Sequence, residues 1–465
     1  MRTSRKGFGG SKLVEASTAR SSSPLSGAVV LTSGVATLGG LLFGYDISVI
    51  SGAMLFLRSD FHLTDSQIEF VVSTLLAGAL VGSAIVGYSA DRWGRRMVLV
   101  VTGLGFTLFS VLSGLSVGLT SLAAARFFIG AFAGIASMVV PLYIAEVSPA
   151  RYRGALVAGN QLAITVGVLL AYLVDYAFAA SQNWRWMFMS AVFPSFALFV
   201  GMIFLPESPR WLARQGQGDR ALASFHRLGR GNEAEAELAE VEGALHKEGE
   251  GFRSLFKPGF RRAVIVGVVL ASIQSFSGID TIVFYAPEVL TRAGYPSAKA
   301  AILATVGIGV MMVLITAVSM FLVDWLGRRA LLLISTGGMG GTLALVGAAF
   351  HSHATGIAVF YELMVAVAFF GVGLGPVVWL LISEIYPTKI RGAAMSLATL
   401  SVWAADWLIT GTFLSLVRWA SPAGAYWIYA FICVLSCAFC YAFVPETKGK
   451  SLEAIERYWH HLGER

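Results

Sequence analysis

The chain has 465 residues, of which 56% are hydrophobic and 13% are charged, and its formal net charge is +7. An ordinary soluble domain carries about 25% charged residues. This composition, with a mean hydropathy of +0.72, therefore excludes a soluble globular protein and indicates an integral membrane protein. The basic excess does not indicate a nucleic-acid partner, because the basic residues lie in short loops between apolar segments, where they report topology.

Apolar segments follow one another along most of the chain. A helix crosses a hydrocarbon layer of ~30 Å with roughly 20 residues, and twelve segments reach that length. We expect them near residues 28–57, 67–90, 97–118, 119–146, 154–179, 186–205, 262–290, 299–323, 330–350, 355–386, 392–417 and 424–444. The sequence thus predicts an all-α membrane protein with twelve transmembrane helices.

A polar stretch at residues 206–260 separates the sixth segment from the seventh. Asn232 followed by Glu235 is typical of a helix start, and residues 233–247 favour helix. We therefore expect a cytoplasmic helical linker whose mixed charges form a solvated face rather than a nucleic-acid site. It would join two six-helix bundles at residues 28–205 and 261–445. Two cytoplasmic tails are predicted at residues 1–27 and 446–465. The first tail is expected to be flexible because it has no periodicity.

Three polar signatures occur twice, in the same order, at the edges of apolar segments. The paired residues are Asp91 with Asp324, Arg95 with Arg328, Glu146 with Glu384, Arg153 with Arg391, and Glu207 with Glu446. Such a repeat predicts two membrane-embedded halves built on one plan. Halves that rock about a shared site at the membrane midplane are typical of secondary transporters.

The distribution of lysine and arginine predicts the orientation of the chain. Positively charged short loops stay in the cytoplasm, and most basic residues fall on the side of the two termini. The other side has Arg58, Arg185, Arg292, Lys299 and Arg418. We therefore expect a multi-pass protein of the plasma or inner membrane with both termini in the cytoplasm.

Two charged residues are expected at membrane depth, Asp46 in the first segment and Arg126 in the fourth. A charge near the bilayer centre costs at least ~2.5 to 3.5 kcal/mol, so each should face the interior of the bundle and be paired. Arginine stays charged, so a carboxylate that alternates between this partner and a proton would act as a proton relay. A static structural salt bridge remains the alternative.

Further polar groups fall in the fifth, seventh, tenth and eleventh segments, where a solute site is expected. Amides and carboxylates beside an indole face suit a polyhydroxylated ring, although tryptophan alone is more often part of a core. The candidates are Gln161, Gln274, Ser275, Asp280, Trp379, Trp403 and Asp406, with Asn160 beside them. The sequence shows no nucleophile with a base and no metal-ligand cluster, so we expect neither an enzyme nor a cofactor or metal site.

These motifs together resemble the sugar porter family of the major facilitator superfamily over residues 28–453. The resemblance rests on an ordered set of motifs. They are Gly44-Tyr45-Asp46, Gly87 with Asp91 to Arg96, Arg126, Glu146 to Gly154, Pro206 to Arg210, Glu384 to Gly392, and Pro445 to Gly449. It implies a twelve-helix fold with a central cavity that takes up a sugar or polyol. It also implies proton coupling, because Asp46 stands where uncoupled facilitators of the family typically have asparagine.

The resemblance also implies a role for the repeated charged residues. In the family they form ion pairs between helices, and between the halves when the inner gate is shut. The residues that inherit this role by motif match are Asp91, Arg95, Glu146, Arg153, Glu207, Asp324, Arg328, Glu384, Arg391 and Glu446.

Several positions depart from the family pattern, and two of them carry an acid in place of an amide. Asp280 and Asp406 stand where asparagine is usual, and Ser275 replaces a glutamine. An ionised carboxylate accepts hydrogen bonds but donates none, so the site should favour a different hydroxyl stereochemistry or an amine-bearing solute. A polyol or unusual hexose is the first choice. The alternative is that Asp280 or Asp406 pairs with another group or is protonated.

Other functions of the same fold stay open at this point. An uncoupled sugar facilitator is one, and a transporter-like nutrient sensor is another, although a sensor is expected to carry a long cytoplasmic extension and about 20 residues follow Pro445. The expected partners are a small polyhydroxylated solute, protons and membrane lipid, with no nucleic acid, and the chain is expected to act as a monomer.

Overall fold

The structure is a computed structural model that describes residues 25–231, 234–245, 255–387, 390–450, 455 and 459. Most of the two predicted tails, at residues 1–27 and 446–465, lies outside these ranges. Asn232, where a helix start was predicted, also lies outside them, as does the side chain of Asp324.

Helices make up the regular structure of the described residues, and twelve spans among them are long and apolar enough to cross a membrane. This confirms the predicted fold class. The six spans of the N-terminal half are formed by α2 (Gly27–Asp60), α3 (Asp65–Trp93), α4 (Arg95–Gly114), α5 (Leu119–Val147), α6 (Arg153–Ala179), and α7 (Trp184–Met189) with α8 (Val192–Phe204). Those of the C-terminal half are formed by α12 (Pro258–Phe276) with α13 (Ile279–Arg292), α14 (Ala298–Leu326), α15 (Arg328–His351), α16 (Gly356–Val372) with α17 (Leu374–Ile385), α18 (Arg391–Thr410), and α19 (Phe413–Phe443).

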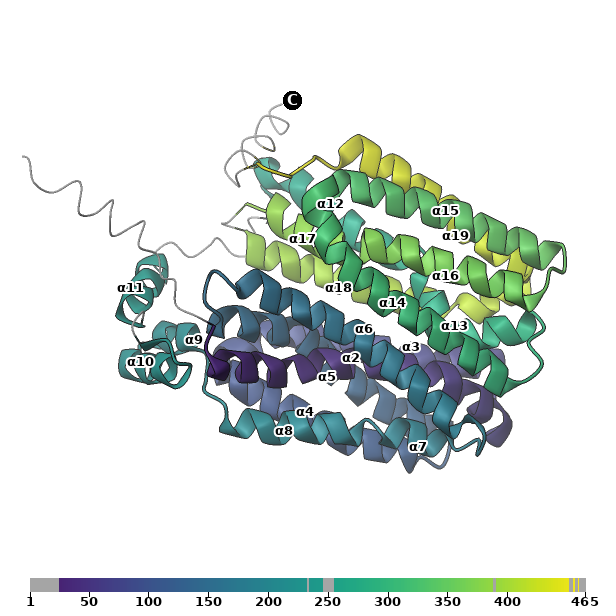
Figure 1. Ribbon diagram of the computed structural model, residues 1–465, viewed down its shortest axis with the longest axis horizontal. Coiled ribbons are helices and arrows are strands. Elements are labelled where there is room, and N and C mark those ends of the chain that lie inside the picture. The colour runs from purple at the N-terminus through teal and green to yellow at the C-terminus, as the bar shows by residue number, and fades with distance from the viewer. Residues whose placement is uncertain are drawn as a thin grey trace, which may run out of the picture.

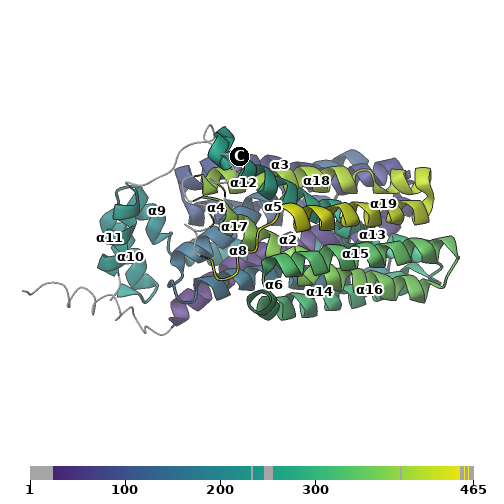
Figure 2. The same ribbon diagram turned by 90° about the horizontal axis from the view of Figure 1, so that it is seen from above.

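The two halves lie side by side, with their helices running along the long axis of the molecule (Figure 1), and in the view from above the helices of the two halves overlap (Figure 2). They meet where α14 packs along α6, α18 along α3, and α13 along α2. Three short helices, α9 (Pro209–Arg214), α10 (Gly218–Arg227) and α11 (Ala234–Leu245), gather at one end of the bundle. We call this the linker end, and the opposite one the far end.

Several spans are interrupted where the sequence predicted continuous helices. The break between α12 and α13 falls at Gly278, whose φ of +86° is a left-handed conformation that glycine adopts without strain. The break between α16 and α17 falls at Gly373. Non-helical backbone at membrane depth is tolerated only where protein or a water-filled cavity surrounds it, so these breaks mark the interior of the bundle.

One predicted boundary is wrong. The eleventh segment was expected to run over residues 392–417, but α18 ends at Thr410 and Phe413 begins α19. Hydrophobicity continues through this turn, so composition alone did not reveal it.

A side chain supports the break before α17. The side-chain amide of Gln274 donates to the carbonyls of Leu374 and Gly375 at 3.0 and 3.2 Å.

A glutamate caps the same helix in each half. Glycine precedes α4 and α15, and its lack of a side chain leaves the first amides of both helices without a local acceptor. The Glu207 carboxylate accepts hydrogen bonds from the amides of Arg95 and Arg96 at 3.1 and 3.0 Å. Glu446 accepts from those of Arg328 and Arg329, both at 3.1 Å. The two repeated motifs therefore recur together because one caps the other.

The same cap has different electrostatics in the two halves. Burial raises the pKa of the Glu207 carboxyl above its ordinary value, although three main-chain amides donate to it. At Glu446 burial acts in the same direction, but hydrogen bonds from four main-chain amides outweigh it and hold the pKa below its ordinary value. Negative charge at a helix N-terminus is stabilising, so the Glu446 carboxylate stabilises the start of α15 at neutral pH.

We predict that Glu446→Gln lowers the thermal stability of the purified protein at pH 7 by about 1 kcal/mol, because a neutral amide oxygen accepts weaker hydrogen bonds. A lowered folded-state pKa contributes stability that is present above the ordinary pKa and is lost as the pH falls through the folded one. The difference between variant and parent should therefore shrink on acidification. Glu235→Gln in α11, where the side chain is exposed, is the matched control. Equal melting temperatures of parent and Glu446→Gln at pH 7 would contradict the capping role.

Candidate functional site

The structure brings the predicted charged pair together inside the N-terminal half. Asp46 of α2 is 2% exposed and Arg126 of α5 is 0% exposed. Nη1 of Arg126 donates to the main-chain carbonyl of Asp46 at 2.9 Å, and the guanidinium lies 5.6 Å from the centre of the Phe188 ring. Within the described residues, Oδ2 of Asp46 has no hydrogen-bond partner. The arginine therefore anchors the backbone of α2 and leaves one carboxyl oxygen open.

A second buried carboxyl group in this half was missed by the sequence analysis. Asp175 of α6 is fully buried, and its Oδ2 accepts a hydrogen bond from the amide of Gly52 in α2 at 3.1 Å. A Cβ at Gly52 would lie 2.5 Å from that oxygen, so glycine is needed for the close approach. The signal was available, because Asp175 lies within the fifth apolar segment.

The predicted solute-site residues come from both halves. Trp403 of α18 is 4% exposed and meets Phe43 of α2 edge-on, with ring centres 5.4 Å apart, so the two halves touch beside the site. Ser275, Asp280 and Asp406 form one cluster, in which the carboxyl groups lie within hydrogen-bonding reach of each other and the serine hydroxyl is next to Asp406.

The remaining candidates take different places. The Gln274 side-chain amide donates to the carbonyl of Leu374 in α17, which lies five residues before Trp379. Gln161 and Trp379 are half-buried, and no described hydrogen bond joins either to the cluster. Asn160 lies against Gly40 of α2, where a Cβ would come 2.2 Å from its Oδ1.

Buried polar atoms in this region lack partners among the described residues. They are Oδ1 of Asn160 and Nε1 of Trp403, whereas Ser275 and Asp280 have Asp406 within hydrogen-bonding reach. Buried polar groups are normally hydrogen-bonded, and each one left unsatisfied costs about 1–3 kcal/mol. A solute that presents several hydroxyl groups could satisfy both the donor and the acceptor. The arrangement is therefore suited to a polyhydroxylated ligand.

The repeated charged residues form matching contacts at the linker end. Arg95 of α4 pairs with Glu146 of α5 and with Asp91, each at 3.1 Å. In the other half, Arg328 of α15 pairs with Glu384 of α17 at 3.0 Å. These pairs join helices within one half.

The arginines that follow each glutamate contact carbonyls near the same helix end. Nε of Arg153 donates to Ala145 at 2.9 Å, and Nε of Arg391 donates to Tyr386 at 3.2 Å. Both contacts again lie within a single half. Together with the ion pairs, they tie the helix ends of each half into one unit.

At the far end, charged residues join the two halves. Arg58 of α2 contacts Asp65 of α3 at 2.7 Å and Glu288 of α13 at 3.3 Å. Arg292 of α13 contacts Glu288 at 2.9 Å and Asp65 at 3.7 Å. The charges alternate in a closed ring that crosses between α2–α3 and α13. We call these four residues the far-end ring.

Further polar contacts cross between the halves near this ring. The buried Glu69 of α3 accepts hydrogen bonds from the amide and hydroxyl of Ser415 at 2.6 and 2.7 Å. The Tyr172 hydroxyl of α6 donates to the carbonyl of Val283 in α13 at 2.9 Å. The halves are thus held together at the far end in this conformation.

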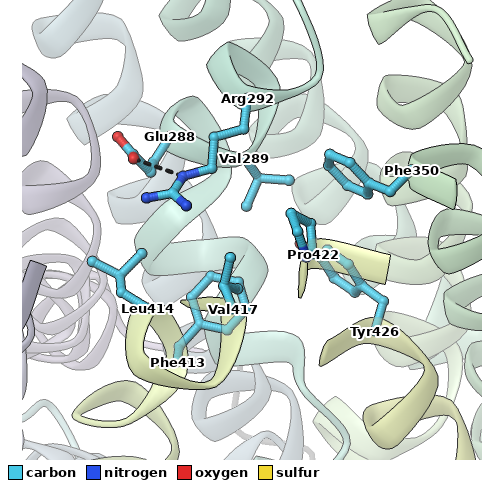
Figure 3. Close-up of a pocket in the computed structure, with 9 residues that line it drawn as sticks. All are labelled: Glu288, Val289, Arg292, Phe350, Phe413, Leu414, Val417, Pro422 and Tyr426. Atoms are coloured by element: carbon cyan, nitrogen blue, oxygen red, sulfur yellow. Dashed lines mark hydrogen bonds and ion pairs between the residues drawn. The ribbon is translucent and has the colours of Figure 1, made fainter. Parts of the chain in front are cut away.

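The far-end contacts were not predicted from the sequence. Arg58 and Arg292 served there only to indicate topology, and Glu69 and Glu288 were missed, although both carboxylates fall inside predicted apolar segments. A small cavity lies beside the ring, with Glu288 and Arg292 on one side and Phe350 and Tyr426 on the other (Figure 3). None of the predicted solute-site residues lines this cavity.

Known proteins similar to this chain are membrane transporters. Residues 32–459 match the family described as sugar (and other) transporter. The chain is 37% identical to a galactose-proton symporter of Escherichia coli (strain K12) over 91% of its own length and 92% of that protein. It is 35% identical to an arabinose-proton symporter of Bacillus subtilis (strain 168) over 93% and 95% of the two lengths.

A solved structure has the same fold. The inward open conformation of the xylose transporter XylE from Escherichia coli superimposes with a TM-score of 0.82 at 33% identity, over 93% of this chain and all of that one. Two six-helix halves around a polar interior define a multi-pass membrane transporter of the major facilitator type. The chain belongs to the sugar transporter family, which confirms the resemblance found in its motifs.

We predict that Glu288→Gln shifts the protein toward a conformation that is open at the far end, because the substitution weakens both contacts of this carboxylate in the ring. Partly exposed ion pairs are each worth about 0.2–1 kcal/mol, so the loss of two should change the ratio of conformations about fivefold. Spin labels at Ser181 and Ser352, in exposed far-end turns of opposite halves, should report a larger population of long distances.

The control for this experiment is Glu235→Gln in α11, which removes an exposed charge far from the ring. It should leave the distance distribution as in the parent. If Glu288→Gln also leaves it unchanged, the ring does not bias the equilibrium between the conformations.

Proposed function

We propose that the protein is a secondary active transporter that imports a monosaccharide or polyol together with protons by alternating access. Its family and its sugar-proton symporter relatives support this function. The observation that carries proton coupling is Asp46, a fully enclosed carboxyl group beside a fully buried arginine with one oxygen open. We also propose that the linker end faces the cytoplasm, as the distribution of basic residues predicts.

Coupling follows from the electrostatics of the Asp46 site. An ionised carboxylate at membrane depth is costly unless it is paired, and Arg126 remains charged throughout the cycle. In this conformation the arginine bonds the main-chain carbonyl of Asp46 rather than its open Oδ2. The Asp46 carboxyl could then hold a proton in this conformation. After releasing that proton, the carboxylate could accept a hydrogen bond from Arg126. An uncoupled facilitator would have no use for a titratable group at this position.

The solute site is proposed to lie between the halves, where Trp403 meets Phe43. The buried polar atoms without partners support this location, because hydroxyl groups of a sugar would satisfy them. The residues proposed to line it are Gln161, Gln274, Ser275, Asp280, Trp379, Trp403 and Asp406. Gln274 acts partly through the backbone of α17, which it supports.

We predict that Asp46→Asn loses the uphill uptake that is driven through this residue but keeps solute exchange, because the variant binds solute and changes conformation without carrying a proton at position 46. One charge moved down 100 mV supplies about 2.3 kcal/mol, which supports roughly 40-fold accumulation. Uptake of labelled sugars and polyols into proteoliposomes, with and without a pH gradient, measures both properties. Concentrative uptake by Asp46→Asn at the level of the parent would remove this residue from the coupling role.

The linker-end pairs are proposed to contribute to the inner gate by exchanging partners when the halves close over this end. We predict that Glu146→Gln combined with Glu384→Gln favours molecules open at the linker end, because neither glutamine can pair with an arginine of the opposite half. A spin-label pair at Tyr88 and Trp325, which are exposed on opposite halves near this end, should show a shift to longer distances. The same distribution in variant and parent would mean that these glutamates only hold helices together.

A further inference from the structure

The two aspartates that depart from the family pattern contact each other. Asp280 lies in the first turn of α13, directly after the break at Gly278, and Asp406 lies on α18 one turn after Trp403. Their carboxyl groups are within hydrogen-bonding reach, and the Ser275 hydroxyl of α12 lies beside Asp406. We call Asp280 and Asp406 the carboxyl pair.

This contact requires a proton. An ionised carboxylate has acceptors and no donor, so two of them cannot share a hydrogen bond. Two carboxyl groups that share a site repel each other when both are ionised, and the pair then retains one proton. None of the ion pairs formed by the described residues includes either aspartate. A shared proton is therefore what offsets the repulsion between the two carboxyl groups.

The groups that face the pair supply no positive charge. Tyr429 of α19 lies near Asp280, and the same tyrosine also lies near Glu69 of α3. The Ser275 hydroxyl, which lies beside Asp406, comes from α12. In the described part of the chain, α2, α14 and α16 place no titratable group against either carboxyl.

The pair is placed to act on the far end. It joins the start of α13 to α18, and α13 carries two of the contacts that hold the halves together, Val283 to Tyr172 and Glu288 to Arg58. The left-handed Gly278 precedes the pair and separates α13 from α12, so α13 can turn about this point. A proton between the aspartates therefore holds a helix that closes the far end.

We propose that Asp280 and Asp406 form a second proton-binding site, separate from Asp46, which takes up one proton from the far-end side and releases it at the linker end in each transport cycle. The shared proton holds α13 against α18 while the far end is closed. Its release leaves two carboxylates that repel each other and free α13 to reopen the far end. This inference rests on the proposed proton symport, and it makes the ratio two protons to one solute.

The ratio can be measured in proteoliposomes held at zero membrane potential with a tenfold solute gradient. A tenfold gradient corresponds to ~1.4 kcal/mol, and one pH unit supplies ~1.36 kcal/mol for each proton moved. Net solute flux should therefore vanish at a pH difference of about 0.5 in the parent. In Asp280→Asn, in Asp406→Asn and in the double variant the net flux should vanish at a pH difference of about 1. The asparagine side chain donates its own N–H to the remaining partner, so no additional proton is bound.

Asp219→Asn is the matched control, because this aspartate is exposed on α10 at the linker end, and its balance point should equal that of the parent. A parent balance point at about 1 overturns the proposal on its own, even if the variants fail to fold, while it leaves single-proton symport intact. A flux that does not respond to pH at all instead contradicts the proposed function. Variants that keep the parent balance point but change the order of preference among sugars, polyols and amino sugars would show that the pair contacts the solute and determines specificity, and that it carries no proton.

Discussion

Polar groups inside a membrane must find their partners within the protein, and this constraint organises the whole molecule. Hydrocarbon offers no hydrogen bonds, so backbone breaks and charged side chains are tolerated only where protein or an internal cavity surrounds them. The breaks at Gly278 and Gly373 and the charges of Asp46 and Arg126 all lie in the interior of the bundle. The breaks and the charges are therefore concentrated in the interior of the two halves, away from the hydrocarbon.

The repeated and the unrepeated contacts have different tasks. The residues that occur twice, such as Glu207 with Glu446 and Arg95 with Arg328, cap helices and pair helix ends within a single half. The contacts that join the halves, such as the far-end ring, have no counterpart in the repeat. The repeated residues build two like units, and unrepeated residues such as Glu288 supply the contacts that hold these units together at the far end in this structure.

The C-terminal half combines a helix break, an acidic pair and the far-end contacts on one short helix. Asp280 lies at the start of α13, and Glu288 lies two turns further on toward the far end. We infer that a change of charge at the start of α13 acts on its far-end contacts, because both lie on one short helix beyond the break at Gly278. The N-terminal half holds its own buried acids, Asp46 and Asp175, on α2 and α6. Each half thus contains carboxyl groups whose state can be coupled to its movement.

The sequence by itself determined the membrane class, most of the spans to within a few residues and the duplicated plan, because hydrophobic length and repeated motifs are local properties. It also indicated Asp46 with Arg126, since charges at membrane depth stand out in an apolar segment. It did not reveal the breaks at Gly373 and Thr410, where hydrophobicity continues without interruption. Only the tertiary structure decided that Glu207 and Glu446 cap helices, that Glu69 and Glu288 join the halves, and that Asp280 meets Asp406, because each contact depends on the packing of helices far apart in the chain.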